Sequence, residues 1–345
     1  MSVESLFVSV VVPCRNEVGY IAACLDSILA SEYPADRLEI LVIDGRSNDG
    51  TRAIVESYAA RSPGVRLIDN PKGITPVALN LGIRAARGEI VVRMDVHVVY
   101  PPEYIPRLVA ALETSGADNV GAVLVTRPAS DKPMARAIAV ALSHPFGVGN
   151  SYFRIGVTAP RWVDTVAFFC CRRSLFERVG MFDEELVRHQ DGEFNARLIG
   201  RGGRILLIPD VRSYYYARAT LPQVRRMYFQ YGYFKPLVAR KLGRIMTLRQ
   251  MVPPLFVVSL IGSAVAGIWV PAAAILSAGI AGLYGALIAA CSIGAARRHG
   301  AKCALALAIV FPVLHVSYGL GFLRRLVELV AMPQTQRATE LPLSR

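Results

Sequence analysis

The chain has 345 residues, of which 53% are hydrophobic, and it carries a net charge of +13. A mean hydropathy of +0.38 is high for a wholly soluble protein and is typical of one large domain joined to a membrane module. No nucleic-acid-binding motif accompanies the positive charge, so we expect partners among anionic lipids and phosphate-bearing substrates and not among nucleic acids. The six cysteines have neither disulfide nor zinc spacing, which predicts buried, reduced thiols.

Short runs rich in Val, Ile and Leu alternate with helical patterns over the first hundred residues. The predicted strands are 7–12, 39–44, 65–69 and 89–95, and the predicted helices are 19–30, 50–61 and 75–86. Alternation of this kind predicts a mainly parallel sheet with both faces covered. Ligands bind such sheets beyond the carboxyl ends of strands, where Asp44 and Asp95 fall. No signal peptide precedes the first strand, so we expect this domain to remain cytoplasmic.

The next hundred residues continue the α/β pattern around one irregular stretch. Residues 143–162 are rich in Gly, Pro and aromatic side chains, which predicts a long loop of the kind that is often functional. The predicted helices are 101–114, 174–179 and 190–199, and the predicted strands are 119–125, 163–171, 204–208 and 211–216.

The C-terminal third is apolar and basic. Residues 221–242 combine aromatic and basic side chains, which is typical of a helix in the lipid headgroup region or of an ordinary surface helix. Residues 252–270, 272–295 and 304–323 contain no Asp, Glu, Lys or Arg. Each tract is close to the roughly 20 residues that cross a bilayer, so we expect about three spans.

The distribution of basic residues supports this topology only in part. Three spans place Arg297, Arg298 and Lys302 inside, as the positive-inside rule prefers, but place Arg324 and Arg325 outside. The third tract contains a proline and a histidine, so a re-entrant segment is the alternative.

Four motifs follow predicted strands or open a helix. They are VPCRNE at residues 12–17, DGRSNDGT at 44–51, VRMDVH at 92–97 and HQDGE at 189–193. Together they resemble the motifs of family 2 glycosyltransferases, which are nucleotide-sugar-dependent enzymes with the GT-A fold. The stretches RMDVHVVYPP (93–102), VDTV (163–166) and RVGMFD (178–183) resemble the ExoA-type subgroup of succinoglycan assembly, whose members extend a glycan on a polyprenyl diphosphate carrier.

The resemblance implies four regions along the chain. Residues 1–220 would form a GT-A catalytic domain with a mixed, mainly parallel sheet, and 221–250 an interfacial amphipathic segment. Residues 251–325 would form the transmembrane region and 326–345 a C-terminal tail. The implied location is the inner cell membrane, multi-pass, with the catalytic domain in the cytoplasm.

The donor site is predicted at the first two motifs. Asp44 can accept hydrogen bonds from a uracil N–H or a ribose hydroxyl, and Pro13 and Glu17 match nucleoside-pocket residues of the family. The resemblance also assigns Arg15 and Arg93 to the nucleotide sugar. Alternatively, Asp44 only begins a turn, and the residues after it only cap the next helix.

A divalent ion, Mn²⁺ or Mg²⁺, is predicted at Asp95 and His97, which stand where the family has its Asp-x-Asp motif. Such an ion offsets the charge that develops on the leaving nucleoside diphosphate. The histidine departs from the broad family pattern and favours Mn²⁺. The alternative is that His97 is only a hydrogen-bonding residue.

Inversion at the anomeric carbon needs one base, and the resemblance assigns that role to Asp191. Glu193 is the local competitor, and attraction of Asp191 to a helix start is the structural alternative. Arg225, Arg226 and Lys235 are assigned to the diphosphate of the donor or of the acceptor, with headgroup binding as the alternative.

We therefore expect an inverting glycosyltransferase that moves a sugar from a nucleotide donor, expected to be UDP-linked, to a polyprenyl-diphosphate-linked glycan. Its other partner is the lipid bilayer, and the product serves cell-surface or extracellular polysaccharide assembly. The alternatives are a polyprenyl-monophosphate glycosyltransferase and a non-catalytic membrane assembly subunit derived from a transferase.

Overall fold

A computed structural model of the chain describes residues 6–245 and 247–331, which form two compact units. The first unit comprises Met1–Val125 and Ser151–Tyr215, and the second comprises Thr126–Asn150 and Tyr216–Arg345. The predicted tail begins at residue 326, but 326–331 continue the last helix and 332–345 lie outside the described residues.

The first unit is built on a nine-stranded mixed sheet, which confirms the predicted fold class. The strand order is β3-β2-β1-β4-β8-β6-β9-β5, and β7 pairs with β9. Strands β1 to β4 are parallel, and the pairs β4–β8, β6–β8 and β5–β9 are antiparallel. The strands are β1 Val8–Cys14, β2 Leu38–Asp44, β3 Val65–Asp69, β4 Ile90–Arg93, β5 Val98–Val99, β6 Asn119–Arg127, β7 Arg161–Trp162, β8 Cys170–Arg172 and β9 Ile205–Tyr216.

The central strands read as continuous apolar runs because both faces of the sheet are covered. Six of the seven residues of β1 are buried. The register pairs Cys14 with Asp44 and Asp44 with Asp69, so three strands end level with one another. This level edge brings the loops after β1, β2 and β3 together.

Helices and aromatic side chains complete the core of the first unit. The rings of Phe169, Phe176, Phe182 and Phe194 pack in one cluster, with Phe182 and Phe194 stacked at 4.8 Å. The helices of this unit are α1 Ile21–Leu29, η1 Ala35–Arg37, α2 Thr51–Arg61, α3 Thr75–Ala85, α4 Tyr104–Ser115, α7 Tyr152–Ile155, α8 Leu175–Val179 and α9 Gln190–Gly200.

Two predicted strand assignments were wrong. Residues 163–171 are a strand only from Cys170 onward, because Val166 and Phe169 are buried in the core cluster by an irregular backbone. Conversely, the two strands predicted at 204–208 and 211–216 are one strand, β9. Its Pro209 falls between the residues that pair with β7 and those that pair with β5, so β9 continues through the proline.

The predicted long loop at 143–162 is not continuous. It contains two short helices, α6 Pro145–Val148 and α7, and it passes from the second unit to the first at Ser151. A further helix, α5 Pro133–Leu142, precedes it in a stretch that no prediction covers.

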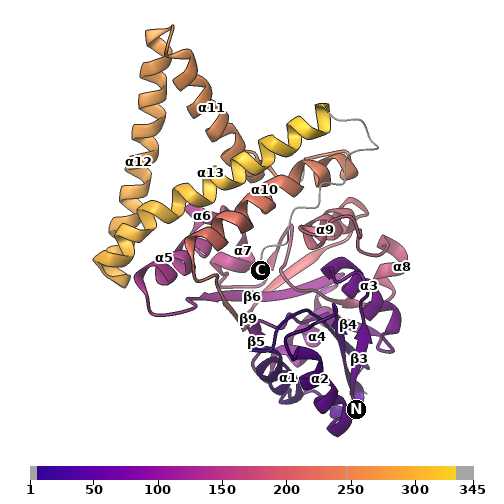
Figure 1. Cartoon of the computed structure of the whole chain (residues 1–345). Helices are drawn as coiled ribbons and strands as arrows, with labels where there is room; N and C mark the ends of the chain where they lie inside the picture. The colour runs from indigo at the N-terminus through magenta and orange to yellow at the C-terminus, as the bar shows by residue number, and fades with distance from the viewer. Residues whose placement is uncertain (1–5, 246, 332–345) are drawn as a thin grey trace. The chain divides into compact units, whose positions relative to one another are not determined.

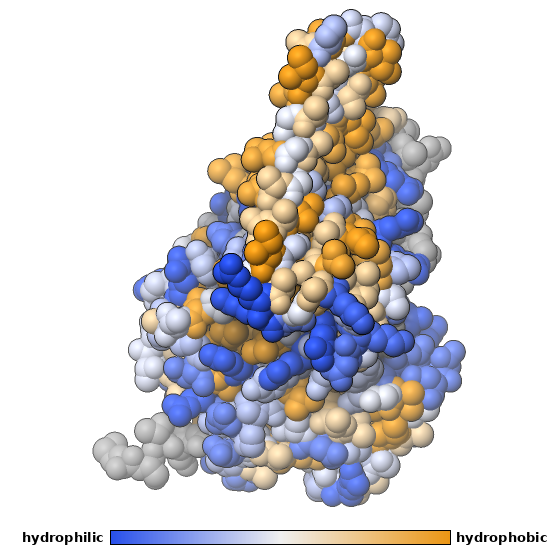
Figure 2. Space-filling model, turned by 90° about the vertical axis from the view of Figure 1, so that its left-hand side faces the viewer, coloured by the Kyte–Doolittle hydropathy of each residue, from blue (hydrophilic) through white to orange (hydrophobic). Residues whose placement is uncertain are grey.

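The second unit is helical. After α10 Leu221–Leu242, at the predicted bounds, come η2 Leu248–Gln250, α11 Val252–Ala266, α12 Pro271–His299 and α13 Ala301–Ala331. Among the described residues, three helical stretches are long and apolar enough to cross a membrane: Leu248–Ala266, Pro271–His299 and Ala301–Ala331. The α11–α12 hairpin in Figure 1 has a mainly hydrophobic surface in Figure 2.

Replacing Gly88 by alanine is expected to destabilise the first unit. An added Cβ would lie 2.6 Å from the backbone nitrogen of Ser9 and 2.7 Å from the carbonyl oxygen of Phe7, so β1 would have to shift. We expect the free energy of unfolding to fall by about 2 kcal/mol. Denaturant unfolding should show no comparable loss for Gly19→Ala, because nothing lies within 4 Å of a Cβ there. Equal stability of the two variants would contradict this packing.

Candidate active site

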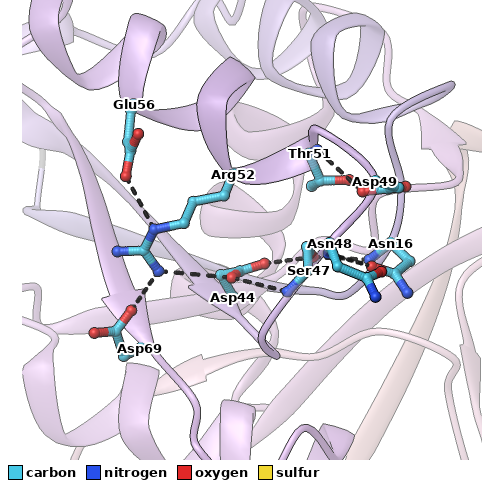
Figure 3. A network of polar contacts seen from close by, with 9 residues as sticks. All are labelled: Asn16, Asp44, Ser47, Asn48, Asp49, Thr51, Arg52, Glu56 and Asp69. Carbon is cyan, nitrogen blue, oxygen red and sulfur yellow. Dashed lines mark hydrogen bonds and ion pairs between the residues drawn. The ribbon is translucent and has the colours of Figure 1, made fainter.

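The loops after β1 and β2 are joined by reciprocal hydrogen bonds (Figure 3). The backbone N–H of Asn16 donates to Ser47 Oγ at 2.8 Å, and the backbone N–H of Asn48 donates to Asn16 Oδ1 at 3.0 Å. These contacts hold the two predicted donor-site motifs as one rigid surface at the carboxyl edge of the sheet.

Asp44 lies at the end of β2 and is almost completely buried, with 1% of its surface exposed. Ser47 Oγ donates to its Oδ1 at 2.5 Å, and Arg52 Nη1 lies 3.7 Å from its Oδ2. Figure 3 shows that Arg52 also reaches Asp69 and Glu56, at 2.6 and 2.9 Å. The carboxylate is thus oriented by its own loop, and both the turn and the ligand interpretation remain compatible with it.

Asp49 has a structural role at the start of α2, although the N-cap residue of that helix is Gly50. One oxygen accepts from the backbone N–H and the hydroxyl of Thr51, and the other accepts from the backbone N–H of Val18. These hydrogen bonds lower the pKa of Asp49, with the Thr51 hydroxyl contributing most. Thr51 Oγ1 in turn accepts from the backbone N–H of Glu17, so the start of α2 is tied to the first motif.

A third loop, after β3, joins this edge through Arg15. Its Nη1 donates to the carbonyl oxygen of Gly73 at 3.0 Å. A Cβ on Gly73 would lie 2.8 Å from that nitrogen, and one on Gly45 would lie 3.1 Å from the Cβ of Arg15. The side chain of Arg15 therefore crosses two glycines at close approach, and its guanidinium is held by the backbone of the third loop.

A buried ion pair ends β4. Arg93, 6% exposed, donates from Nε and Nη2 to the two oxygens of Asp95 at 2.8 and 3.0 Å. Burial lowers the pKa of Arg93, but the charge and hydrogen bonds of Asp95 and the nearby charge of Asp191 raise it overall. The structure therefore brings Asp191 near the pair of Arg93 and Asp95, from which it is distant in sequence.

One nitrogen of this guanidinium is left over. Arg93 Nη1 is buried, and no hydrogen-bond partner for it exists among the residues that the structure describes. A buried donor without a partner is costly, so the geometry is suited to an acceptor that arrives with a ligand.

The loop that follows Arg93 is fixed from two sides. Tyr100 Oη accepts from the backbone N–H of Asp95 at 2.7 Å, and the ring of His97 packs edge-on against Tyr215 at 5.4 Å. The guanidinium of Arg154, on α7, lies 5.6 Å from the same Tyr215 ring, and its Nη1 is also buried without a partner in the described chain. The structure thus adds an arginine that meets the same aromatic ring as His97.

Neither Tyr100 nor Arg154 was predicted as a site residue. Tyr100 stands five residues after Asp95 in an apolar stretch, and only its buried hydroxyl reveals that it holds the Asp95 backbone. Arg154 lies in the segment predicted as a loop, where no hydrophobic periodicity indicates which way a side chain points. The signal for both residues is tertiary.

Asp95 and His97 can supply only part of a metal coordination sphere. No group of three or more His, Cys, Asp or Glu side chains that could hold a metal ion occurs within residues 6–245 and 247–331. Ions that bind nucleotides often take one or two carboxylates from the protein and the remaining oxygens from substrate phosphates. The pair therefore fits an ion that arrives with a phosphate substrate, and does not fit a resident metal centre.

The start of α9 separates the roles of two acidic residues. Glu193 is buried, with 4% of its surface exposed, and both its oxygens are paired with Arg197. Arg197 also donates to the carbonyl oxygens of Val179 and Met181 at 2.6 and 2.7 Å. Glu193 thus belongs to a structural clamp, whereas Asp191 is half-buried and accepts from the backbone N–H of the next residue.

Backbone strain coincides with these loops. In the described chain the non-glycine residues with positive φ are Asn16, Arg46 and His189, at 53°, 60° and 64°. They follow β1, follow β2 and precede α9. Left-handed backbone at such residues concentrates where function requires an unusual conformation.

The remaining predicted residues belong to the second unit. Arg225 and Arg226 are exposed on the first turns of α10, and Lys235 on the same helix is buried. In the first unit, Pro13 is half-buried within β1 and pairs with Ile43.

Comparison with known proteins identifies relatives for this arrangement. The family model described as "Glycosyl transferase family 2" matches residues 9–180. The succinoglycan biosynthesis protein ExoA of Rhizobium meliloti is 30% identical over 331 residues, which cover 92% of this chain and 94% of that protein. A dolichyl N-acetyl-α-D-glucosaminyl phosphate 3-β-D-2,3-diacetamido-2,3-dideoxy-β-D-glucuronosyltransferase of Methanococcus voltae is 25% identical over 248 residues, 68% of this chain and 74% of that protein.

A solved structure supports the fold. A mannosyltransferase from Pyrobaculum calidifontis, in complex with GDP-Man and Mn²⁺, aligns with a TM-score of 0.56 at 23% identity. The alignment covers 90% of this chain and 88% of that one.

The two acidic residues of α9 should respond differently to neutralisation. In Glu193→Gln, Arg197 loses its charged partner in a largely buried site, so the free energy of unfolding should fall by about 3 kcal/mol. Asp191→Asn should change stability little, because Asp191 is half-buried and accepts its hydrogen bond from the adjacent backbone. Denaturant unfolding of both variants checks this, and a larger loss for Asp191→Asn would contradict the assignment.

Proposed function

The chain belongs to glycosyl transferase family 2 and is a nucleotide-sugar glycosyltransferase. From that premise we propose that it transfers the donor sugar, with inversion at the anomeric carbon, to a polyprenyl-diphosphate-linked glycan. The observation that carries this proposal is the cluster of Arg93, Asp95 and Asp191 at the carboxyl end of the central strand β4. In this cluster a buried arginine–aspartate ion pair lies near a half-buried carboxylate.

The nucleoside of the donor would bind at the carboxyl ends of β1 and β2. Asp44 would accept hydrogen bonds from the base or ribose, beside Pro13 and Glu17, in a loop surface that Ser47 and Asn16 already hold in shape. Arg15, in the first loop and held by the Gly73 carbonyl of the third, would also contact the donor. We expect a UDP-sugar.

The diphosphate of the donor would lie beside β4, where its charge is matched. Arg93 Nη1 and Arg154 Nη1 are buried donors that a phosphate oxygen would satisfy. Asp95 and His97 would hold a divalent ion, and that ion would offset negative charge on the leaving diphosphate. The M. voltae and R. meliloti relatives carry names from glycan assembly, and the P. calidifontis enzyme was solved with Mn²⁺.

Asp191 would act as the base. Its carboxylate would take the proton of the acceptor hydroxyl as the acceptor oxygen bonds to the anomeric carbon and the bond from that carbon to the phosphate oxygen breaks. Glu193 is an unsuitable base because Arg197 engages both of its oxygens. The electrostatic link between Asp191 and Arg93 joins the acceptor side of the reaction to the donor side.

A lipid-linked acceptor is consistent with the helical second unit. The M. voltae relative is named for a dolichyl-phosphate-linked sugar, and the R. meliloti relative for a polysaccharide. Arg225 and Arg226, exposed at the start of α10, would meet the diphosphate of the acceptor or of the donor, and Lys235 would support them from the same helix.

Asp191→Asn should abolish turnover while preserving donor binding. Loss of a general base lowers the rate by roughly 10²- to 10⁴-fold, and the asparagine leaves the donor site intact. Wild type and variant would be reconstituted in membranes with Mn²⁺, a panel of UDP-, GDP- and dTDP-sugars, and lipid extracts that bear diphosphate-linked glycans.

Asp36→Asn is the matched control, because Asp36 is exposed in η1, before the amino end of β2. If sugar transfer survives in Asp191→Asn, a residue other than Asp191 is the base. Tight nucleotide-sugar binding by wild type without any transfer would favour the assembly-subunit alternative.

Arg93→Lys should weaken donor binding although the charge is kept. Lysine cannot contact both oxygens of Asp95 and also present a third nitrogen to a phosphate. We expect the Kd of the nucleotide sugar to rise about tenfold, which corresponds to ~1.4 kcal/mol. Isothermal titration with Mn²⁺ measures this, with Arg66→Lys as control, since Arg66 pairs with Glu39 near the amino end of β2. An unchanged Kd in Arg93→Lys would remove the arginine from the donor site.

A further inference from the structure

The three apolar helical stretches of the second unit are packed very differently. In the most apolar 18-residue part of each stretch, 17% of Leu248–Ala266 and 6% of Pro271–His299 is buried, against 56% of Ala301–Ala331. Figure 2 shows the exposed hydrophobic surface of the hairpin that α11 and α12 form. The first two stretches therefore present apolar surface nearly all round, as lipid-crossing helices do, whereas α13 is packed against protein.

Burial along α13 follows one face. Leu307, Val310 and Leu314 are buried at helical spacing, and Leu305 and Ile309 are exposed by 73% and 51%. The helix thus has a protein face and an apolar outer face. This pattern fits a helix that rests on protein and meets lipid from one side only.

The C-terminal half of α13 runs along α10, in the same direction (Figure 1). Gly321 approaches the backbone of Phe229, and Arg325 Nη1 donates to Tyr233 Oη at 2.9 Å. Tyr233 also donates to Glu328 at 2.5 Å. The two helices are therefore joined by close backbone packing and by a polar network, so they share one depth relative to any membrane.

Helix α10 cannot itself cross a bilayer. It carries five basic side chains within 22 residues and no acidic one: Arg225, Arg226, Lys235, Arg240 and Lys241. Charged side chains are strongly disfavoured in the hydrocarbon core. The C-terminal half of α13, which pairs with α10, is therefore held on the side of the bilayer where α10 begins.

The N-terminal half of α13 contacts α12, where Tyr284 Oη lies 2.8 Å from His315 Nδ1, and also two elements that are equally unable to cross. It packs against α5 and α6, where His315 Nε2 lies 2.8 Å from the carbonyl oxygen of Phe146, and the rings of Phe311 and Phe146 are 5.0 Å apart. Ten residues of α5 span about 15 Å, half of a hydrocarbon core of about 30 Å. The chain enters this segment at Thr126 from the first unit and returns to the first unit at Ser151.

We propose that the chain crosses the bilayer twice, through α11 and α12, and that α13 stays with α10 and α5 on the entry side, immersed in one leaflet. The lipid of that leaflet is the partner of its outer apolar face. Two crossings also satisfy the positive-inside rule, which three spans break at Arg324. Arg297, Arg298 and Arg324 then all lie on the same side as α10.

Sidedness of the two ends of the chain tests this proposal. The full chain would carry an epitope tag at each end, and sealed membrane vesicles of known orientation would be treated with protease. Two crossings predict that both tags are cleaved from the same side. Cleavage of the two tags from opposite sides would show that α13 crosses, and would overturn the proposal.

The hairpin is tested separately with a membrane-impermeant maleimide. Trp269→Cys, at the tip between α11 and α12, should be labelled only from the side opposite the N-terminal tag. Ile245→Cys, between α10 and α11, is the matched control and should be labelled from the side of the tag, above the background of the unsubstituted chain. A tip that is labelled from the tag side, or from neither side until detergent is added, would also overturn the proposal. These readouts need no substrate, so they are independent of the proposed reaction.

Discussion

The ion pair between Arg93 and Asp95 is the constraint around which the site is arranged. A buried arginine and a nearly buried aspartate are each expensive to remove from water, and only their two-point contact makes both tolerable. The pair raises the pKa of Arg93, places positive charge near Asp191, and leaves one nitrogen of Arg93 without a partner among the described residues. Tyr100 then fixes the backbone of Asp95, from which the carboxylate reaches Arg93.

The same edge of the sheet stores backbone strain that its hydrogen bonds hold in place. Asn16 and Arg46 adopt left-handed conformations in loops that are linked by Ser47 and Asn48. His189 does so just before Asp191. A parallel sheet supplies level strand ends, and ligands of such sheets bind beyond the carboxyl ends of strands, where these loops lie.

In the second unit, packing distinguishes helices that composition makes alike. Helices α12 and α13 are both long and apolar, yet one is almost wholly exposed and the other is half-buried. The difference arises from glycines: Gly232 and Gly321 let α10 and α13 approach until backbone meets backbone. Arg325 and Tyr233 then add polar contacts that an isolated span would lack.

The sequence alone determined the alternation of strands and helices and the bounds of α10, because periodicity is a local property. The resemblance of three strand-end motifs and one helix-start motif to a known family implied the GT-A fold class. The sequence placed Asp44, Asp95 and Asp191 at the ends of elements, and the resemblance favoured Asp191 over Glu193, but the physical distinction between the two is the contact of Glu193 with Arg197. It misread residues 163–171, because burial of Val166 and Phe169 produces the same apolar run as a strand. Tertiary structure alone revealed the roles of Arg154 and Tyr100 and the protein face of α13. Contacts between elements far apart along the chain produce no periodic pattern in the sequence.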